Sequence, residues 1–125
     1  MPRRDWRAFL EDIVVAARDV REFTDGVTFE QYSESKLLRA AVERRLLTLG
    51  EAVNQLRKLR PDKAELLGDV RGVVDFRNIL VHGYFGIRDD KVWDAVQHDI
   101  PPLLAITEPM LKEELDKLDA EDDPT

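Results

Sequence analysis

Residues 35–59, with the sequence SKLLRAAVERRLLTLGEAVNQLRKL, decide the fold of this chain. Their apolar side chains recur every three or four residues, which is the spacing of one face of an α-helix. This stripe consists of Leu38, Val42, Leu46, Leu49, Val53 and Leu56. Arg60-Pro61 ends it, because the residue before a proline is pushed out of the α region. The pattern predicts a long amphipathic helix that buries one face against other elements.

The segments on either side show the same periodicity. The first predicted elements are a helix over 3–23, stopped by Asp25-Gly26, and a short helical turn opened by the capping-box pair Thr28 and Gln31. After the long helix come a helical turn over 62–67 and a helix from Asp69 to His82, with Gly83 as its C-cap. A helix capped by Asp89-Asp90 begins at about Lys91, Pro101-Pro102 interrupts or kinks it, and the last helix continues to about Asp119. No segment alternates like a strand. We therefore expect an all-α antiparallel bundle of four or five helices. It forms one domain over residues 1–119, followed by an acidic frayed tail over residues 120–125.

Composition narrows the protein class. The chain has 125 residues, of which 43% are hydrophobic and 36% charged, and this suits one soluble helical domain with one core. No apolar run of about 18 residues exists to cross a membrane, and the first residues lack the apolar region of a signal peptide. Cysteine is absent, which excludes disulfides and thiolate sites and fits the reducing cytoplasm, where we expect the protein.

The net charge of −7 is unevenly distributed. Residues 108–125 hold eight acidic side chains and two lysines, so they contribute −6. The rest of the chain is close to neutral and holds all thirteen arginines. Charge alone therefore neither supports nor excludes a nucleic-acid substrate.

The segment from Asp69 to His82 is apolar over most of a helical wheel drawn at about 100° per residue. We expect it to be buried on two sides, by its own bundle and by a partner subunit or a ligand cleft. Arg77 lies within the apolar arc, among Val73, Leu80 and Val81. An arginine there pairs with a carboxylate, extends out to solvent along its stem, or faces a ligand anion. The wheel leaves these three alternatives open.

Arg77 and His82 together suit RNA cleavage without a metal. Imidazole transfers protons near neutral pH, and guanidinium grips phosphate oxygens while keeping its charge. On position alone, a histidine at His82 is more often a helix-end residue favoured by the macrodipole than a catalyst. Because one histidine per chain is placed here, an acid–base pair requires water or the His82 of a second copy across a two-fold axis.

We expect no metal and no cofactor. His98 lies on another helix and is interpreted as a surface or interhelical residue. His82 with Asp89 and Asp90 matches no spacing of metal ligands. Glu51 falls opposite the apolar stripe of its helix and is interpreted as structural or solvated.

The stretch Arg77 to Tyr84 resembles the signature of the HEPN superfamily and, more closely, of the HepT toxins: Arg, four residues, His, any residue, Tyr. Supporting features are Asn78 in the polar position after Arg, Gly50-Glu51-Ala52, Gly83-Tyr84-Phe85 and Val92-Trp93. The resemblance covers about residues 5–110. The chain departs from it at Leu66-Leu67-Gly68-Asp69, where many relatives carry a Pro-Trp pair.

The resemblance implies the toxin of a toxin–antitoxin system, a homodimeric, metal-independent endoribonuclease with its cleft between protomers. Arg77 and His82 would be catalytic, with Asn78 in support. A nucleotidyltransferase antitoxin would neutralise it by adding AMP to Tyr84, which otherwise is an ordinary half-buried tyrosine. The alternatives are a non-catalytic helical partner of a nucleotidyltransferase, with Arg77 paired to a carboxylate, and a homodimeric bundle without a ligand.

Overall fold

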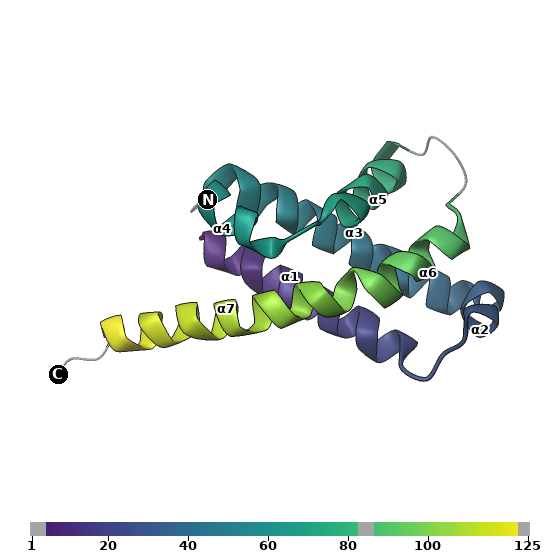
Figure 1. The fold of residues 1–125 in the computed structure, drawn as a ribbon, viewed down its shortest axis with the longest axis horizontal. Helices are drawn as coiled ribbons and strands as arrows, with labels where there is room; N and C mark the ends of the chain where they lie inside the picture. Colours follow the sequence, from purple (N-terminus) through teal and green to yellow (C-terminus); the bar gives the residue numbers. More distant parts are fainter. Residues whose placement is uncertain (1–4, 83–86, 123–125) are drawn as a thin grey trace.

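The computed structural model describes residues 5–82 and 87–122, without the side chains of His82 and Asp122. All regular structure in these residues is helical (Figure 1), so the all-α prediction is confirmed. The helices are α1 (Trp6–Thr24), α2 (Phe29–Glu34), α3 (Lys36–Leu59), α4 (Pro61–Ala64), the 3₁₀ turn η1 (Glu65–Leu67), α5 (Arg71–His82), α6 (Asp89–His98) and α7 (Ile100–Asp122). None of the helices in this described part has the length and hydrophobicity needed to cross a membrane.

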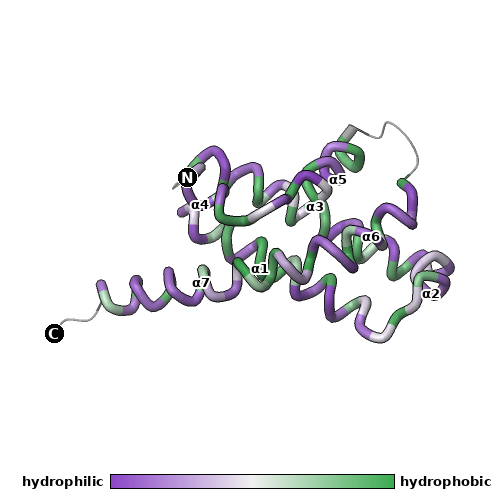
Figure 2. Tube along the Cα trace, in the orientation of Figure 1, coloured by the Kyte–Doolittle hydropathy of each residue, from purple (hydrophilic) through white to green (hydrophobic). Residues whose placement is uncertain are grey.

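Helices α1 and α3 form the centre of the bundle. Helix α3 packs on α1 and on α5, while α1 packs on α3 and on α7. The stripe predicted from residues 35–59 supplies much of the core, and five of its six members are fully buried, namely Val42, Leu46, Leu49, Val53 and Leu56. In Figure 2, hydrophobic residues recur between hydrophilic ones along α1 and α3. Burying each such Leu or Val side chain contributes about 1.5–3 kcal/mol to folding.

The starts of α2 and α3 follow the sequence closely. The Thr28 side chain accepts a hydrogen bond from the Gln31 backbone N–H at 3.1 Å, and the Gln31 side chain accepts one from the Thr28 N–H at 2.9 Å. This is the predicted capping box. The Ser35 hydroxyl accepts from the Leu38 N–H at 3.1 Å and caps α3 in the same way.

The starts of α5 and α6 differ from the prediction. Helix α5 begins at Arg71 instead of Asp69, because the Asp69 carboxylate accepts the Arg71 backbone N–H at 3.1 Å from outside the helix. Helix α6 begins at Asp89, its N-cap is Arg88, and no side chain caps it. The predicted cap by Asp89-Asp90 was therefore wrong: both carboxylates lie inside the first turn, where the helix dipole favours negative charge.

The connection that departs from the family pattern is a tight turn. Leu67 ends η1 and is buried at 2% exposure. Gly68 follows with φ +81°, in the left-handed region that a residue with a Cβ rarely adopts. Gly68 thus turns the chain from η1 into α5.

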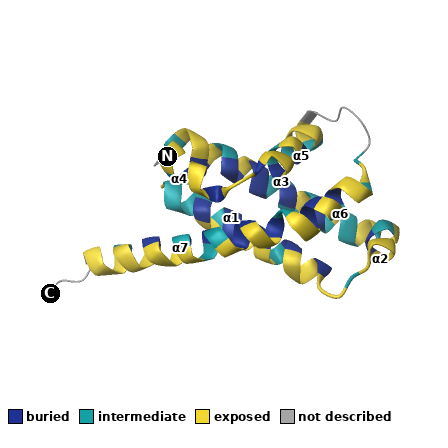
Figure 3. Ribbon diagram, in the orientation of Figure 1, coloured by how far each residue is buried: buried dark blue, intermediate teal, exposed yellow. Residues whose placement is uncertain are grey.

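The interruption predicted at Pro101-Pro102 is confirmed, but the break lies at Asp99, two residues before Pro101. Helix α6 ends at His98, and Asp99 separates it from α7. Both prolines lie in the first turn of α7, where backbone N–H groups have no partner within the helix, so the missing proline N–H costs no hydrogen bond. Helix α7 continues to Asp122, past the predicted end at Asp119. Its C-terminal part projects from the bundle and is mostly exposed (Figure 3).

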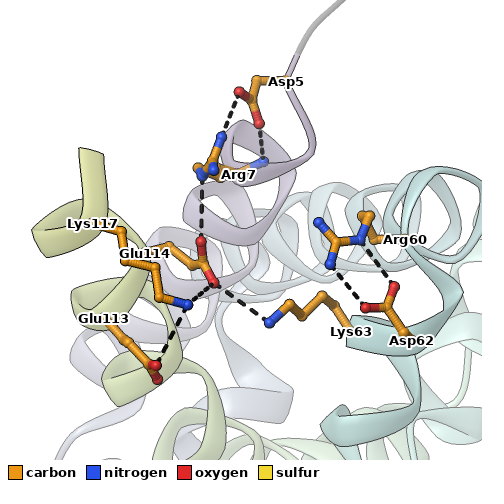
Figure 4. Close-up of polar contacts among 8 residues, drawn as sticks. All are labelled: Asp5, Arg7, Arg60, Asp62, Lys63, Glu113, Glu114 and Lys117. Carbon is orange, nitrogen blue, oxygen red and sulfur yellow. Dashed lines mark hydrogen bonds and ion pairs between the residues drawn. The ribbon is translucent and has the colours of Figure 1, made fainter. Parts of the chain in front are cut away.

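One buried carboxylate attaches α7 to the N-terminal end of the bundle (Figure 4). The Glu114 side chain is 5% exposed and lies 3.4 Å from Arg7 Nε, 3.5 Å from Lys63 Nζ and 3.5 Å from Lys117 Nζ. Burial alone would raise the pKa of Glu114, but Lys117, Lys63 and Arg7 together lower it below its usual value. Glu114 therefore holds its charge and joins α7 to α1 and α4.

Candidate active site

Helix α5 carries the candidate residues Arg77 and Asn78 and the backbone of His82. Val73 and Phe76, at 1% and 7% exposure, are its buried residues in the core. Because α5 packs mainly on α3 and only lightly on α6, the position of its polar side chains depends on the fit between α3 and α5.

The two helices approach each other most closely at Gly50 of α3. A Cβ at this position would lie 2.5 Å from the Cβ of Arg77 and 3.1 Å from the backbone oxygen of Val73. Real Cβ atoms essentially never approach another atom as closely as 2.5 Å, so only glycine allows this spacing. The Gly50-Glu51-Ala52 feature thus has a physical reason, since Gly50 lets the base of the Arg77 side chain lie directly against α3.

Arg77 has few protein partners. Its Nη1 donates a hydrogen bond to the Asn78 Oδ1 at 3.1 Å, and its buried Nε has no hydrogen-bond partner in the part of the chain that the structure describes. No carboxylate of residues 5–81 and 87–121 forms an ion pair with it. Of the three alternatives for Arg77, an ion pair is therefore absent from the described part of the chain. What remains is a half-buried guanidinium, held by Asn78, that lies on a groove.

The groove lies between α3 and α5 and has a volume of about 560 Å³. Its lining residues are all polar or charged: Glu51, Asn54, Gln55, Arg57, Lys58 and Arg77. Three positive charges and one negative charge meet there, in a chain with a net charge of −7. Glu51, interpreted from the sequence as structural or solvated, is exposed and forms part of this wall.

His82 is the last residue of α5, and its side chain lies outside the described residues, as do Gly83 and Tyr84. Continuous helix separates Arg77 from His82 by five residues, which corresponds to about 7.5 Å along the axis and about 140° around it. The two residues therefore occupy different faces of the same helix end.

One side of α5 is uncovered. Ile79 and Val81 are 38% and 48% exposed, and Asp75 and Asn78 beside them are exposed too. The prediction that this helix is buried on two sides is thus confirmed only for the side on α3. The other side presents apolar surface that a partner or ligand would cover.

A polar cluster that the sequence did not reveal fixes the start of α6. Arg39 Nη1 lies 3.4 Å from Asp89 Oδ2 and donates to the backbone oxygen of Ser33 at 2.6 Å, while the Ser33 hydroxyl donates to Asp89 at 3.3 Å. Burial, and then the charge of Asp89, raise the pKa of the neighbouring Glu43, against the opposing effect of Arg39. These contacts attach the start of α6 to α2 and α3.

Aromatic packing reinforces the same corner. The Trp93 ring lies 5.3 Å from the buried Tyr32 ring and 6.4 Å from that of Phe29. Burial, together with Glu43 and Asp89, raises the pKa of the Tyr32 phenol. The Val92-Trp93 feature noted in the sequence therefore has a packing role, with Val92 fully buried and Trp93 closing the corner.

The other titratable candidates remain apart from the groove. His98 is exposed at the end of α6, with its Nε2 3.7 Å from Asp94 Oδ1, as its interpretation as a surface residue predicts. Within residues 5–81 and 87–121, no three His, Cys, Asp or Glu side chains are grouped so that they could hold a metal ion.

Comparison with known proteins places the chain in a family. The model of the family described as "Ribonuclease HepT-like" matches residues 13–110. A Methanocaldococcus jannaschii protein named "Putative RNase" is 39% identical over 105 residues, which cover 82% of this chain and 94% of that relative. A second protein of that name and organism is 34% identical over 90% of this chain and 93% of its own length.

An archaeal relative from Thermococcus cleftensis has the name "Probable ribonuclease HepT". It is 33% identical, over 81% of this chain and 91% of its own length. No solved structure matches the chain. The family match spans most of the bundle, including α3 and α5. The chain therefore belongs to the HepT-like ribonuclease family, within the HEPN superfamily.

Proposed function

We propose that this chain is a metal-independent endoribonuclease in which Arg77 and His82 are catalytic and Asn78 orients Arg77. The observation that carries the proposal is the state of Arg77: its guanidinium has no carboxylate partner in the described residues and lies on a polar groove. A half-buried cation of this kind suits a phosphate, because guanidinium binds phosphate oxygens at two points.

The chemistry is an internal transfer at phosphorus. The His82 imidazole accepts the proton of the ribose 2′-OH, and the 2′-oxygen attacks the adjacent phosphorus. The bond from phosphorus to the 5′-oxygen breaks, and that oxygen leaves with a proton from an imidazolium or from water. The products are a 2′,3′-cyclic phosphate and a 5′-hydroxyl. Arg77 stabilises the charge that develops on the phosphorane oxygens.

The proposed active form is a homodimer. Arg77 and His82 lie on different faces of one α5, and the exposed Ile79 and Val81 leave apolar surface beside them. A two-fold axis next to this surface would bring two His82 residues to one cleft, as base and acid.

The proposed biological role is that of a toxin acting on cytoplasmic RNA. Its partner is a nucleotidyltransferase antitoxin that joins AMP to Tyr84: the Tyr84 oxygen attacks the α-phosphate of ATP, and pyrophosphate leaves. The added anion would occupy the place of an RNA phosphate. The family resemblance supports this step, and mass spectrometry of the protein expressed with a neighbouring nucleotidyltransferase tests it, through AMP-sized additions on Tyr84.

The decisive experiment measures RNA cleavage by the purified protein with a chelator present. Wild type should cleave, His82→Ala and Arg77→Ala should lose about 10²-fold or more of the rate, and His98→Ala should retain it. His98 is the matched control because it is the second histidine of the chain and is exposed far along α6. Equal cleavage by wild type and His82→Ala would refute the assignment.

A second candidate is a non-catalytic helical partner of a nucleotidyltransferase. The uncovered apolar side of α5 favours it, since Ile79 and Val81 would serve equally as a contact with another protein. A stable complex with the nucleotidyltransferase, combined with no RNA cleavage by the isolated chain, would establish it over the first.

A further inference from the structure

We propose that Asn54, Arg57 and Lys58 of α3 bind the RNA backbone beside the scissile phosphate. These residues form one wall of the groove whose other wall carries Arg77. The inference rests on the proposed ribonuclease function. It adds the path of the substrate, which would run from the catalytic residues along the C-terminal half of α3.

The pairing of the basic side chains carries the inference. Most of them in the described residues already have a carboxylate partner, as Arg45 has in Asp19 at 3.0 Å and Arg60 in Asp62 at 2.9 Å. Arg57 and Lys58 are exposed and form no ion pair with residues 5–81 and 87–121. Together with Arg77 they place three positive charges in one groove, against the single carboxylate of Glu51. Such a surface attracts a polyanion even when the whole chain is acidic.

Helix geometry gives the wall its order. Glu51, Asn54 and Lys58 follow one another at steps of three and four, so they lie on one face of α3 over about 10 Å. Asn54 and Gln55 lie between the carboxylate and the two cations and offer amide groups to phosphate and ribose oxygens. Contacts of this kind position a strand without reading its sequence. A single-stranded segment therefore fits the wall, independent of base identity.

The test is binding of a fluorescent 2′-O-methyl RNA oligonucleotide, which cannot be cleaved because its 2′-oxygen carries no proton. Anisotropy titrations between 50 and 200 mM salt would compare wild type with Arg57→Gln/Lys58→Gln. We expect about tenfold weaker binding at low salt. The slope of log K against log salt should fall by up to about 1.4, because each lost phosphate contact on a single strand removes about 0.7.

Arg21→Gln/Lys36→Gln is the matched control. It removes two charges that are also exposed and form no ion pair with described residues, and it should bind like wild type. Thermal unfolding of both variants checks that they fold. If Arg57→Gln/Lys58→Gln binds with the affinity and slope of wild type, or if wild type does not bind, the inference is overturned. Binding that depends on Arg57 and Lys58, in a protein that does not cleave RNA, would refute the proposed function and the placement beside a scissile phosphate, and it would leave only the RNA-binding role of this wall.

Discussion

Gly50 lies so close to Arg77 that a Cβ added to Gly50 would be 2.5 Å from the Cβ of Arg77. The Cβ of Arg77 is bonded directly to the α5 backbone, so it can move away only if the whole helix moves. The backbone oxygen of Val73 would lie 3.1 Å from the same added Cβ, so a shift of α5 that relieved only the Arg77 contact would not make room for it. The spacing of α3 and α5, and with it the position of the guanidinium, therefore depends on glycine at this position.

Gly50→Ala should destabilise the protein and lower RNA cleavage. Alanine improves helix propensity by about 1 kcal/mol, but overpacking costs about 1–3 kcal/mol, so we expect a net loss of about 1 kcal/mol in the free energy of unfolding. Urea denaturation measures the loss, and a cleavage assay measures the displacement of Arg77. Thr48→Ala, on the same helix, should leave cleavage unchanged. A Gly50→Ala protein as active as wild type would contradict the proposed tight fit.

Arg77→Met should separate activity from stability. The buried Arg77 Nε has no hydrogen-bond partner among residues 5–81 and 87–121, and an unsatisfied buried polar group costs about 1–3 kcal/mol. Methionine keeps a long flexible stem in the same space, so the free energy of unfolding should stay equal or rise by about 1 kcal/mol. The cleavage rate should fall about 10²–10³-fold, as for other lost groups that stabilise developing charge.

Denaturation at fixed protein concentration, combined with single-turnover cleavage, checks both halves of the Arg77→Met prediction. Arg77→Lys, which keeps the charge but not the planar fork, should be intermediate in rate. A loss of more than about 2 kcal/mol in Arg77→Met would show instead that Arg77 holds the fold together.

Ile79→Glu should convert the proposed dimer to a monomer and abolish cleavage. Ile79 is 38% exposed in the single chain, so a charge there costs the monomer little but would lie buried in an interface built on this side of α5. Sedimentation measures the change in mass. Leu37→Glu is the control, because Leu37 is 83% exposed on α3 and away from α5. An Ile79→Glu protein that remains dimeric would move the interface elsewhere.

The parts of this fold that sequence patterns predicted are those with local causes. The α3 stripe follows from helical periodicity, and the capping box of Thr28 and Gln31 needs only residues three apart. The Arg39–Asp89 contact joins residues 50 positions apart, and neither residue type signals a partner at that distance. Arg77 is the intermediate case. Its place in an apolar arc marked it as unusual in the sequence, but only the arrangement of α3 and α5 shows that no carboxylate of the described residues pairs with it.

Glu43→Gln should make the protein more stable at pH 7 and leave it unchanged in acid. Burial and Asp89 raise the folded-state pKa of Glu43 above its ordinary value of 4.5. Below the unfolded-state pKa both states hold the proton. As pH rises through the window up to the folded-state pKa, the folded state must give up a proton it binds more tightly, and stability falls. Glutamine removes that loss.

The free energy of unfolding, measured from pH 4 to pH 7, tests the Glu43 prediction. The wild-type curve should drop relative to that of Glu43→Gln as pH rises. Glu11→Gln, an exposed change on α1, is the matched control for the same substitution at the surface. Parallel curves for Glu43→Gln would show that Arg39 fully offsets the burial of the Glu43 carboxylate.

Glu114→Gln should lower the free energy of unfolding by weakening the attachment of α7, whereas the same substitution at Glu113 should have little effect. Glu114 is 5% exposed and pairs with Arg7, Lys63 and Lys117, whereas Glu113 is 70% exposed and, among the described residues, forms an ion pair only with Lys117, at 3.6 Å. Removing the buried charge leaves three cations without their common partner, and because they are partly solvated we expect a loss of about 2 kcal/mol. Glu113→Gln should lose less than about 0.5 kcal/mol, as exposed pairs do.

The lowered pKa of Glu114 fixes how this difference depends on pH. Its contribution is fully present above the unfolded-state pKa and is lost as pH falls through the lower folded-state pKa. The difference in unfolding free energy between wild type and Glu114→Gln should therefore shrink as the pH falls. For Glu43→Gln the difference should grow as the pH rises, with the variant as the more stable protein. Because Glu114 joins α1, α4 and α7, none of which lines the groove, Glu114→Gln should cleave RNA at the wild-type rate below its melting temperature. Loss of cleavage in the folded variant would show that α7 contributes to the active form.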